Sequence, residues 1–206
     1  MGQQVRRELR TAIPLIANMA DFNYEQAVSL RQAGFTGVYH AARLGEGEVT
    51  RINLEKRLQT MEAARRAGLG VGTCVEPIGP EHSMEEIIEI IIIAREARPG
   101  FSGAMRRVTL PGTALDKYGM LGETRIALIV AVVRLATSRE VPGNCTHEPN
   151  VLGAVSGANL LWAEAGSNPR DVVNNTEASR GYNVARCRDM LVDAGWQVLE
   201  GPSKFC

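Results

Sequence analysis

Residues 16–44 read IANMADFNYEQAVSLRQAGFTGVYHAARL, and this stretch decides the fold. An apolar run within residues 11–18 predicts a strand, and residues 23–33 follow with the spacing of an amphipathic helix. Gly34 stands where glycine commonly ends a helix, and residues 37–40 form the next apolar run. Strand, helix and strand in this order predict a parallel βαβ unit.

The same alternation continues along the rest of the chain. We predict further strands at residues 70–75, 105–110, 160–164 and 196–199, and further helices at residues 54–67, 83–95, 123–137, 150–156 and 182–194. Ser83, followed three residues later by Glu86, predicts a capping box. About six strand–helix units are fewer than the eight of a closed barrel. We therefore expect an α/β fold, a partial TIM-type (β/α) barrel with two open sheet edges, rather than a doubly wound sheet.

Polar side chains gather where the predicted strands end. They are Asn18, Asp21, His40, Arg43, Glu46, Cys74, Glu76, Arg106, Arg107, Cys145, His147, Glu148 and Glu164. Parallel strands place their carboxyl ends on one side, and barrel enzymes have their active sites there. The pattern favours a barrel with its chemistry at that end.

Composition excludes several classes of function. The 206 residues contain 23 Lys and Arg against 23 Asp and Glu, so no basic footprint for nucleic acid is present. The apolar run at residues 87–93 is too short to span a bilayer, and no secretory signal is found. The four cysteines lack the spacing of a zinc knuckle or a CxxC pair. We expect a cytoplasmic protein whose partner is a small-molecule substrate, and a homodimer as a further option.

Several motifs, in order, resemble the biotin-synthase-like radical SAM enzymes. They are residues 16–44, RLQTMEAARRAGLGVG at 57–72, EPIGPEHS at 76–83, LPGTAL at 110–115 and GANL at 157–160. NCTHEP at 144–149 and NPRD at 168–171 are similar to the branch implicated in the iron-guanylylpyridinol hydrogenase cofactor of methanogens. The resemblance implies a barrel core at residues 1–140 and a biotin/thiamin-synthesis-associated-like end of the same barrel at 141–206.

The resemblance also implies a cofactor set, S-adenosylmethionine (SAM) and a [4Fe–4S] cluster, and a role in cofactor biosynthesis. The CxxxCxxC loop that holds the cluster in that family is missing from this sequence. We expect a truncated reading frame that lacks the family's first two strands, and the alternative is a natural short protein that never binds the cluster.

By this resemblance, the cofactor-binding residues are Tyr39, His40, Arg43, Glu46 and Asn18. Arginine suits the SAM carboxylate as a planar two-pronged donor, and a carboxylate suits the ribose hydroxyls or the amino group. We therefore expect Arg43 and Glu46 to take these parts, although Glu46 could be only a loop charge. Asp21 could line the cavity, or it could cap a helix that begins at Phe22.

The predicted substrate-binding residues are Cys74, Glu76, Arg106, Arg107, His147 and Glu148. Cys74 could instead be a small core residue, and only one of the two adjacent arginines can face inward on a strand. The candidate metal ligands are Cys145 and His147, since thiolate and imidazole are soft and borderline ligands. We expect no auxiliary cluster, because too few cysteines lie on neighbouring strands.

Two other functions remain open. A metal-dependent lyase or aldolase would hold zinc with His40, His147 and Glu148. A degenerate, non-catalytic subunit would bind SAM or a cofactor precursor alone.

Overall fold

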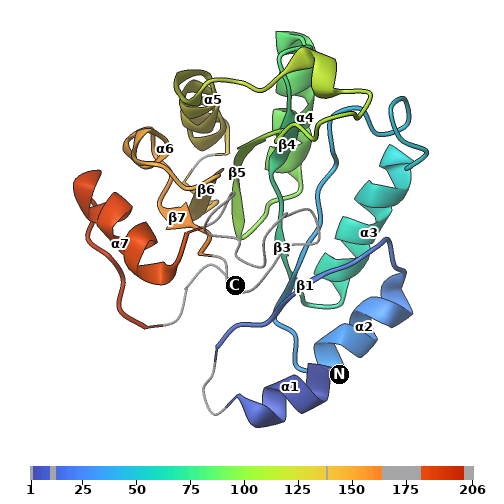
Figure 1. Ribbon diagram of the computed structural model, residues 1–206. Helices are drawn as coiled ribbons and strands as arrows, with labels where there is room; N and C mark the ends of the chain where they lie inside the picture. Colours follow the sequence, from blue (N-terminus) through green and yellow to red (C-terminus); the bar gives the residue numbers. More distant parts are fainter. Residues whose placement is uncertain (1, 10–12, 138, 164–181, 202–206) are drawn as a thin grey trace.

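The computed structural model describes residues 2–9, 13–137, 139–163 and 182–201. Figure 1 shows one curled sheet with the helices on its outer side. All strand pairings are parallel, in the order β1-β2-β3-β5-β6-β7, and β4 pairs with β5. The strands are β1 (Ile16–Asn18), β2 (Gly37–Tyr39), β3 (Gly70–Gly72), β4 (Val75–Ile78), β5 (Phe101–Arg106), β6 (Gly143–His147) and β7 (Leu160–Leu161). The predicted partial TIM-type barrel is confirmed.

The helices alternate with these strands. They are α1 (Gly2–Glu8), α2 (Tyr24–Gln32), α3 (Leu54–Arg66), α4 (Met84–Glu96), α5 (Glu123–Ala136), α6 (Val151–Val155) and α7 (Val184–Asp193), with a 3₁₀ turn, η1 (Asp116–Tyr118). The capping box predicted at Ser83 is confirmed, and α2 has a second one between Asn23 and Gln26. The interpretation of Asp21 as a helix cap is wrong, because Asn23 fills that position.

Three predicted strands differ from the structure. Residues 70–75 contain the whole of β3 and the first residue of β4, and the strand expected at 105–110 is β5, which starts earlier, at Phe101. Residues 196–199 form no strand. The indole N–H of Trp196 donates to the Ala154 carbonyl at 3.0 Å, so this segment is fastened to α6 by a side chain instead of joining the sheet.

Strand β6 was not predicted, because GNCTH is polar for a central strand. The structure buries it completely at Asn144, Cys145 and Thr146. The Asn144 side-chain amide donates to the carbonyls of Val130 and Gly157, at 3.3 and 3.2 Å. A buried amide group is tolerated in a strand when it finds such backbone partners.

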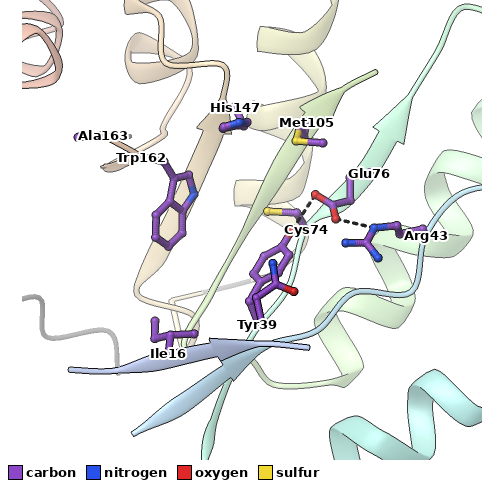
Figure 2. A pocket seen from close by; sticks show the side chains of 10 residues that line it. Ile16, Tyr39, Arg43, Cys74, Glu76, Met105, His147, Trp162 and Ala163 are labelled. Carbon is purple, nitrogen blue, oxygen red and sulfur yellow. Dashed lines mark hydrogen bonds and ion pairs between the residues drawn. The ribbon is translucent and has the colours of Figure 1, made fainter. Parts of the chain in front are cut away.

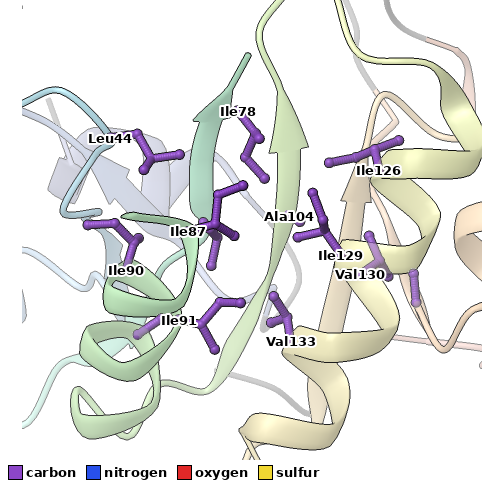
Figure 3. Packing of buried hydrophobic residues seen from close by; sticks show 13 residues of the cluster. Leu44, Ile78, Ile87, Ile90, Ile91, Ala104, Ile126, Ile129, Val130 and Val133 are labelled. Carbon is purple, nitrogen blue, oxygen red and sulfur yellow. The ribbon is translucent and has the colours of Figure 1, made fainter. Parts of the chain in front are cut away.

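Two apolar clusters lie between the helices and the outer face of the sheet. Figure 3 shows the larger one, in which α4 and α5 pack on β4 and β5 through Ile87, Ile91, Val130 and Val133, among others. The smaller cluster fastens α2 and α3 to the first three strands. Leu58 of α3 has the helical spacing of Met61 and Ala64, which are buried, but the residue itself is 39% exposed.

Some predictions fall outside the described residues. These are Glu164 at the end of the predicted strand 160–164 and the NPRD motif at 168–171. Among the described helices, none is long and apolar enough to cross a membrane.

Candidate functional site

A cavity of about 430 Å³ opens at the carboxyl ends of the strands. Figure 2 shows the lining side chains gathered around it. It is lined by Ile16, Asn18, Tyr39, Arg43, Cys74, Glu76, Met105, His147, Trp162 and Ala163. Its size lies within the usual range for small-molecule sites, about 300–1,000 Å³.

Glu76 is the central charge of this cavity. Its side chain is only 5% exposed. One carboxylate oxygen, Oε2, accepts a hydrogen bond from the Tyr39 hydroxyl at 2.6 Å, and the other, Oε1, accepts one from Arg43 Nε at 2.9 Å. Burial, followed by the nearby Cys74 and Glu76, raises the pKa of Tyr39 well above its ordinary value, so this hydroxyl remains a donor.

Arg43 is the cation that the cavity offers to a ligand. Its side chain is 35% exposed, and only Nε is engaged by Glu76. Among the described residues, no hydrogen-bond partner is found for its two terminal nitrogens. Glu76 therefore fixes the orientation of a guanidinium group whose remaining donors can bind a carboxylate in two-pronged fashion.

Two thiols meet in the cavity wall. The Sγ atoms of Cys74 and Cys145 lie 3.1 Å apart. They come from either side of β5, and Gly103 on that strand leaves room for the contact. A Cβ at Gly103 would lie 2.1 Å from the Cys145 carbonyl oxygen and 2.6 Å from its Sγ. The hydrogen bond with Cys145, together with burial, raises the pKa of Cys74 well above the ordinary value, which keeps it a thiol.

Aromatic rings fill the barrel interior near the cavity. Tyr39 stacks on Phe101 with ring centroids 6.1 Å apart, and Phe101 meets the edge of Trp162 at 5.2 Å. A Cβ at Gly72 would lie 2.0 Å from the Phe101 ring. Only glycine at that position lets the Phe101 ring lie across the sheet.

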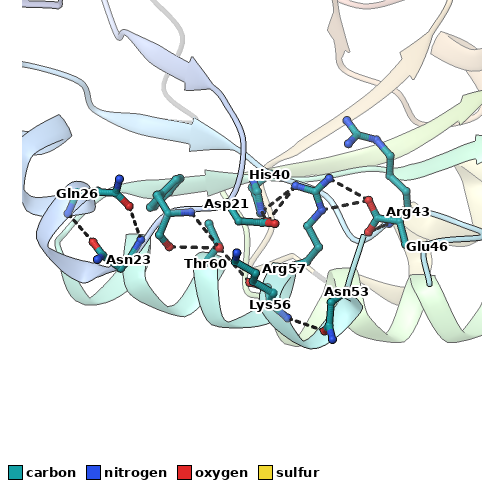
Figure 4. Close-up of polar contacts among 11 residues, drawn as sticks. Asp21, Asn23, Gln26, His40, Arg43, Glu46, Asn53, Lys56, Arg57 and Thr60 are labelled. Carbon is teal, nitrogen blue, oxygen red and sulfur yellow. Dashed lines mark hydrogen bonds and ion pairs between the residues drawn. The ribbon is translucent and has the colours of Figure 1, made fainter. Parts of the chain in front are cut away.

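A buried ion-pair network lies on the helix side of the sheet (Figure 4). Arg57 of α3 donates to Glu46 Oε1 from Nη2 at 3.0 Å and to Asp21 Oδ1 from Nη1 at 3.1 Å. His40 Nε2 lies 3.0 Å from the same Asp21 oxygen. Burial and the Arg57 cation lower the pKa of His40. The neutral ring then carries its hydrogen on Nε2, and this N–H donates a hydrogen bond to Asp21.

This network also holds the loop that carries Arg43. The second oxygen of Glu46, Oε2, accepts the backbone N–H of Arg43 at 3.1 Å. Arg43 is thus held twice, through its backbone by Glu46 and through its side chain by Glu76.

The two arginines at the carboxyl end of β5, Arg106 within the strand and Arg107 directly after it, form ion pairs of their own. Arg106 donates to Glu148 Oε2 at 2.7 Å and to the Leu121 carbonyl at 2.8 Å. Arg107 pairs with Glu81, and its hydrogen bond lowers the pKa of that carboxyl group. Neither arginine is among the residues that line the cavity.

The structure therefore sorts the predicted residues into two groups. The cavity brings together Asn18, Tyr39, Arg43, Cys74, Glu76 and His147, and Cys145 lies directly behind Cys74. The ion pairs beside it contain His40, Glu46, Arg106, Arg107 and Glu148. The zinc site suggested for a lyase is not assembled, because His40 and Glu148 bind other side chains and only His147 lines the cavity.

Sequence reasoning missed Arg57, Met105 and Trp162. A charge at a buried helix position was the available signal for Arg57, and inward alternation along β5 was the signal for Met105. Within the described ranges, no group of three His, Cys, Asp or Glu side chains is arranged to hold a metal ion.

No family model and no curated protein matches the chain. Among solved structures, it is similar to methylornithine synthase at 16% identity, with a TM-score of 0.70 over 99% of this chain and 62% of that one. It is similar to HydG, a maturase of the [FeFe]-hydrogenase, at 15% identity, with a TM-score of 0.63 over 89% of this chain and 44% of that one. It is also similar to a type I 3-dehydroquinate dehydratase from Clostridium difficile at 11% identity, with a TM-score of 0.53 over 92% of this chain and 72% of that one.

At these identities the likeness shows the fold and nothing finer. The chain spans 62% of the methylornithine synthase chain and 44% of the HydG chain. What it shares with them is a curled sheet of parallel strands with helices outside.

Proposed function

We propose that this chain is the SAM- and substrate-binding portion of a radical SAM enzyme. The observation that carries the proposal is the guanidinium group of Arg43 at the carboxyl ends of the strands. Buried Glu76 fixes its orientation through Nε, and no residue in the described part of the chain binds its terminal nitrogens. The motif order resembles the biotin-synthase-like enzymes, and the fold likeness to methylornithine synthase and HydG supports the superfamily. The biotin-synthase-like type and a role in cofactor biosynthesis are the finer parts of this proposal.

The cavity residues suit the chemical groups of SAM. The free donors of Arg43 bind its carboxylate, and Asn18 at the end of β1 can accept from or donate to its polar groups. Tyr39 and Trp162 give flat apolar surface for an adenine ring. His147, Met105 and Cys74, on the side formed by β4, β5 and β6, are left to contact a small substrate.

His40 and Glu46 take a supporting part in this proposal. Their side chains are tied to Asp21 and Arg57 and are absent from the cavity lining. They hold the Arg43 loop instead of binding SAM directly.

A [4Fe–4S] cluster does not fit the described residues. In radical SAM enzymes three cysteine thiolates hold the cluster that reduces SAM, whereas here Cys74 and Cys145 form a buried pair and Cys187 lies on α7. The proposal for this chain is therefore limited to binding SAM and substrate.

SAM titration of the chain as it stands tests the proposal. We expect isothermal titration calorimetry to detect SAM binding, and Arg43→Gln to weaken it about tenfold or more, because a charge-assisted hydrogen-bond pair contributes about 1.5–3 kcal/mol. Arg65→Gln on the outer face of α3 is the matched control and should bind like the wild type. Absence of SAM binding by the folded wild type would contradict the proposal, as would equal affinities of the two variants.

A further inference from the structure

Sulfur atoms gather on one wall of the cavity. The Sγ atoms of Cys74 and Cys145 lie 3.1 Å apart, and the two residues are 3% and 0% exposed. Cys74 lines the cavity, so the pair can be reached from it, and Met105 in the same lining adds a thioether sulfur. The proposed SAM site makes no use of Cys145, and the close contact of two thiols therefore needs a separate explanation.

The two cysteines lie on opposite sides of β5. Cys74 stands between two residues that both pair with that strand, Thr73 by a backbone hydrogen bond and Val75 by register. Cys145 on β6 is the register partner of Gly103 from the other side. The two side chains meet over Gly103, where the strand has no side chain of its own to separate them.

This placement opposes a disulfide bond. Neighbouring strands lie about 4.8 Å apart, so two residues with one strand between them have Cα atoms about 9 Å apart. A disulfide needs Cα atoms no more than about 7 Å apart, and a larger separation cannot be bridged without moving the backbone. The sulfur atoms can instead move farther apart by side-chain rotation, because Cys74 borders the open cavity.

A metal ion between the sulfurs uses the separation that a disulfide cannot. Two metal–sulfur bonds of about 2.3 Å each span up to about 4.6 Å, so a rotation that separates the sulfurs by about 1 Å admits an ion. Zinc and iron–sulfur clusters take three or four protein ligands, and the described residues offer no group of three His, Cys, Asp or Glu for them. Thiolates with a nearby thioether select copper(I) instead.

We propose that Cys74 and Cys145 bind one copper(I) ion between their sulfur atoms in the cavity wall. Each thiol releases its proton to solvent as its sulfur–copper bond forms, and the copper remains copper(I) throughout. One positive and two negative charges leave the bound unit with a charge of −1, and Arg43 supplies a cation in the same cavity lining. The inference goes beyond the proposed function and does not depend on SAM binding.

Anaerobic titration of the reduced full chain with copper(I), in competition with the chelator bicinchoninate, tests this site. We expect one ion per chain. Loss of even an indirect partner of a metal ligand weakens binding about 10–100-fold, so loss of a ligand in Cys74→Ser or Cys145→Ser should weaken it about 100-fold or more. The matched controls are Cys187→Ser on α7 and Cys206→Ser, which lies outside the described residues, and both should bind like the wild type.

Two further measurements keep the test independent of folding defects in the serine variants. Circular dichroism verifies that each variant is folded, with Cys74→Ala and Cys145→Ala as replacements where a serine variant is not. X-ray absorption of the copper-loaded wild type should show sulfur neighbours around the metal. Copper should also raise the Tm of the wild type, because an ion that binds only the folded chain stabilises it.

Three results would overturn the proposal. The first is a folded wild type that loses all its copper to the chelator, or whose copper has only nitrogen and oxygen neighbours. The second is unchanged copper affinity in both Cys74→Ser and Cys145→Ser. The third is an intact mass lower by two hydrogen atoms with a peptide that links Cys74 to Cys145, which would show that the pair closes into a disulfide. Copper binding without SAM binding would contradict only the proposed function, and the reverse result only this inference.

Discussion

Replacing Arg57 by methionine tests whether the buried ion-pair network stabilises the fold. The Arg57 side chain is 8% exposed, and its two carboxylate partners, Glu46 and Asp21, are 2% and 17% exposed. Methionine keeps most of the length of the apolar stem of Arg57 and removes only the charge and the donors. The variant therefore leaves the Glu46 carboxylate buried without its cation.

The cost of this change follows from the burial. Removing one partner of a buried ion pair costs about 3–5 kcal/mol. In a chain of this size each kcal/mol shifts the melting temperature by about 2–4 °C, so Tm should fall by about 6–20 °C. Arg65→Met is the matched control, because Arg65 is 42% exposed and its pair with Glu62 contributes about 0–1 kcal/mol.

Urea unfolding measures the free energy of unfolding of both variants. A double variant then tests whether the unpaired Glu46 carboxylate causes the loss of stability. Glu46→Gln removes the unpaired charge, so Arg57→Met combined with Glu46→Gln should be more stable than Arg57→Met alone. The reasoning fails if Arg57→Met unfolds within about 0.5 kcal/mol of the wild type, as Arg65→Met is expected to do.

Three further predictions concern the sheet, the pH and the thiols. Gly103→Ala should lower the urea midpoint severely or prevent folding, because the added Cβ would lie 2.1 Å from a backbone oxygen, whereas a normal midpoint would show that β5 can shift. The pKa of His40 is lowered from 6.5, so between the lowered value and 6.5 only the unfolded chain binds the proton. The contribution of His40 to stability should be complete above about pH 6.5 and fall below it. In His40→Gln, the urea midpoint should therefore fall less steeply as the pH is lowered. Iodoacetamide should modify Cys74 of the folded chain far more slowly than that of the urea-unfolded chain, as measured by peptide mass spectrometry, because the pKa of this buried thiol is raised; equal rates would refute this.

The fold could be predicted because local signals agreed with one another. The helix starts at Asn23 and Ser83 are visible as capping residues, and the alternation of apolar runs gives the parallel sheet. Strand β6 could not be predicted in this way, because Asn144 and Thr146 are polar and their burial depends on partners far along the chain. The same limit applies to residues 196–199, whose apolar residues suit a strand but which pair with none of the described strands.

The site could be predicted to the level of strand ends but not to the level of side-chain direction. Tyr39 and His40 are adjacent, so strand alternation allows only one of them to face the barrel interior. The structure directs Tyr39 to the cavity and His40 to the helix side, next to Phe22. The role of Arg57 was hidden because its two carboxylate partners come from separate loops, which only the tertiary fold brings together.

The cavity residues around Arg43 and the ion-pair network around Arg57 influence one another through their charges. Arg43 and Arg57 supply two formal positive charges, against three negative charges on Asp21, Glu46 and Glu76, so the connected set has a formal charge of about −1. A ligand that brings only a carboxylate would add to this excess, even though Arg43 could hold it. A ligand that carries a carboxylate together with two cationic centres, as SAM does with its ammonium and sulfonium groups, would neutralise it. The buried carboxylates that orient Arg43 therefore also favour a zwitterionic ligand with net positive charge over a simple anion.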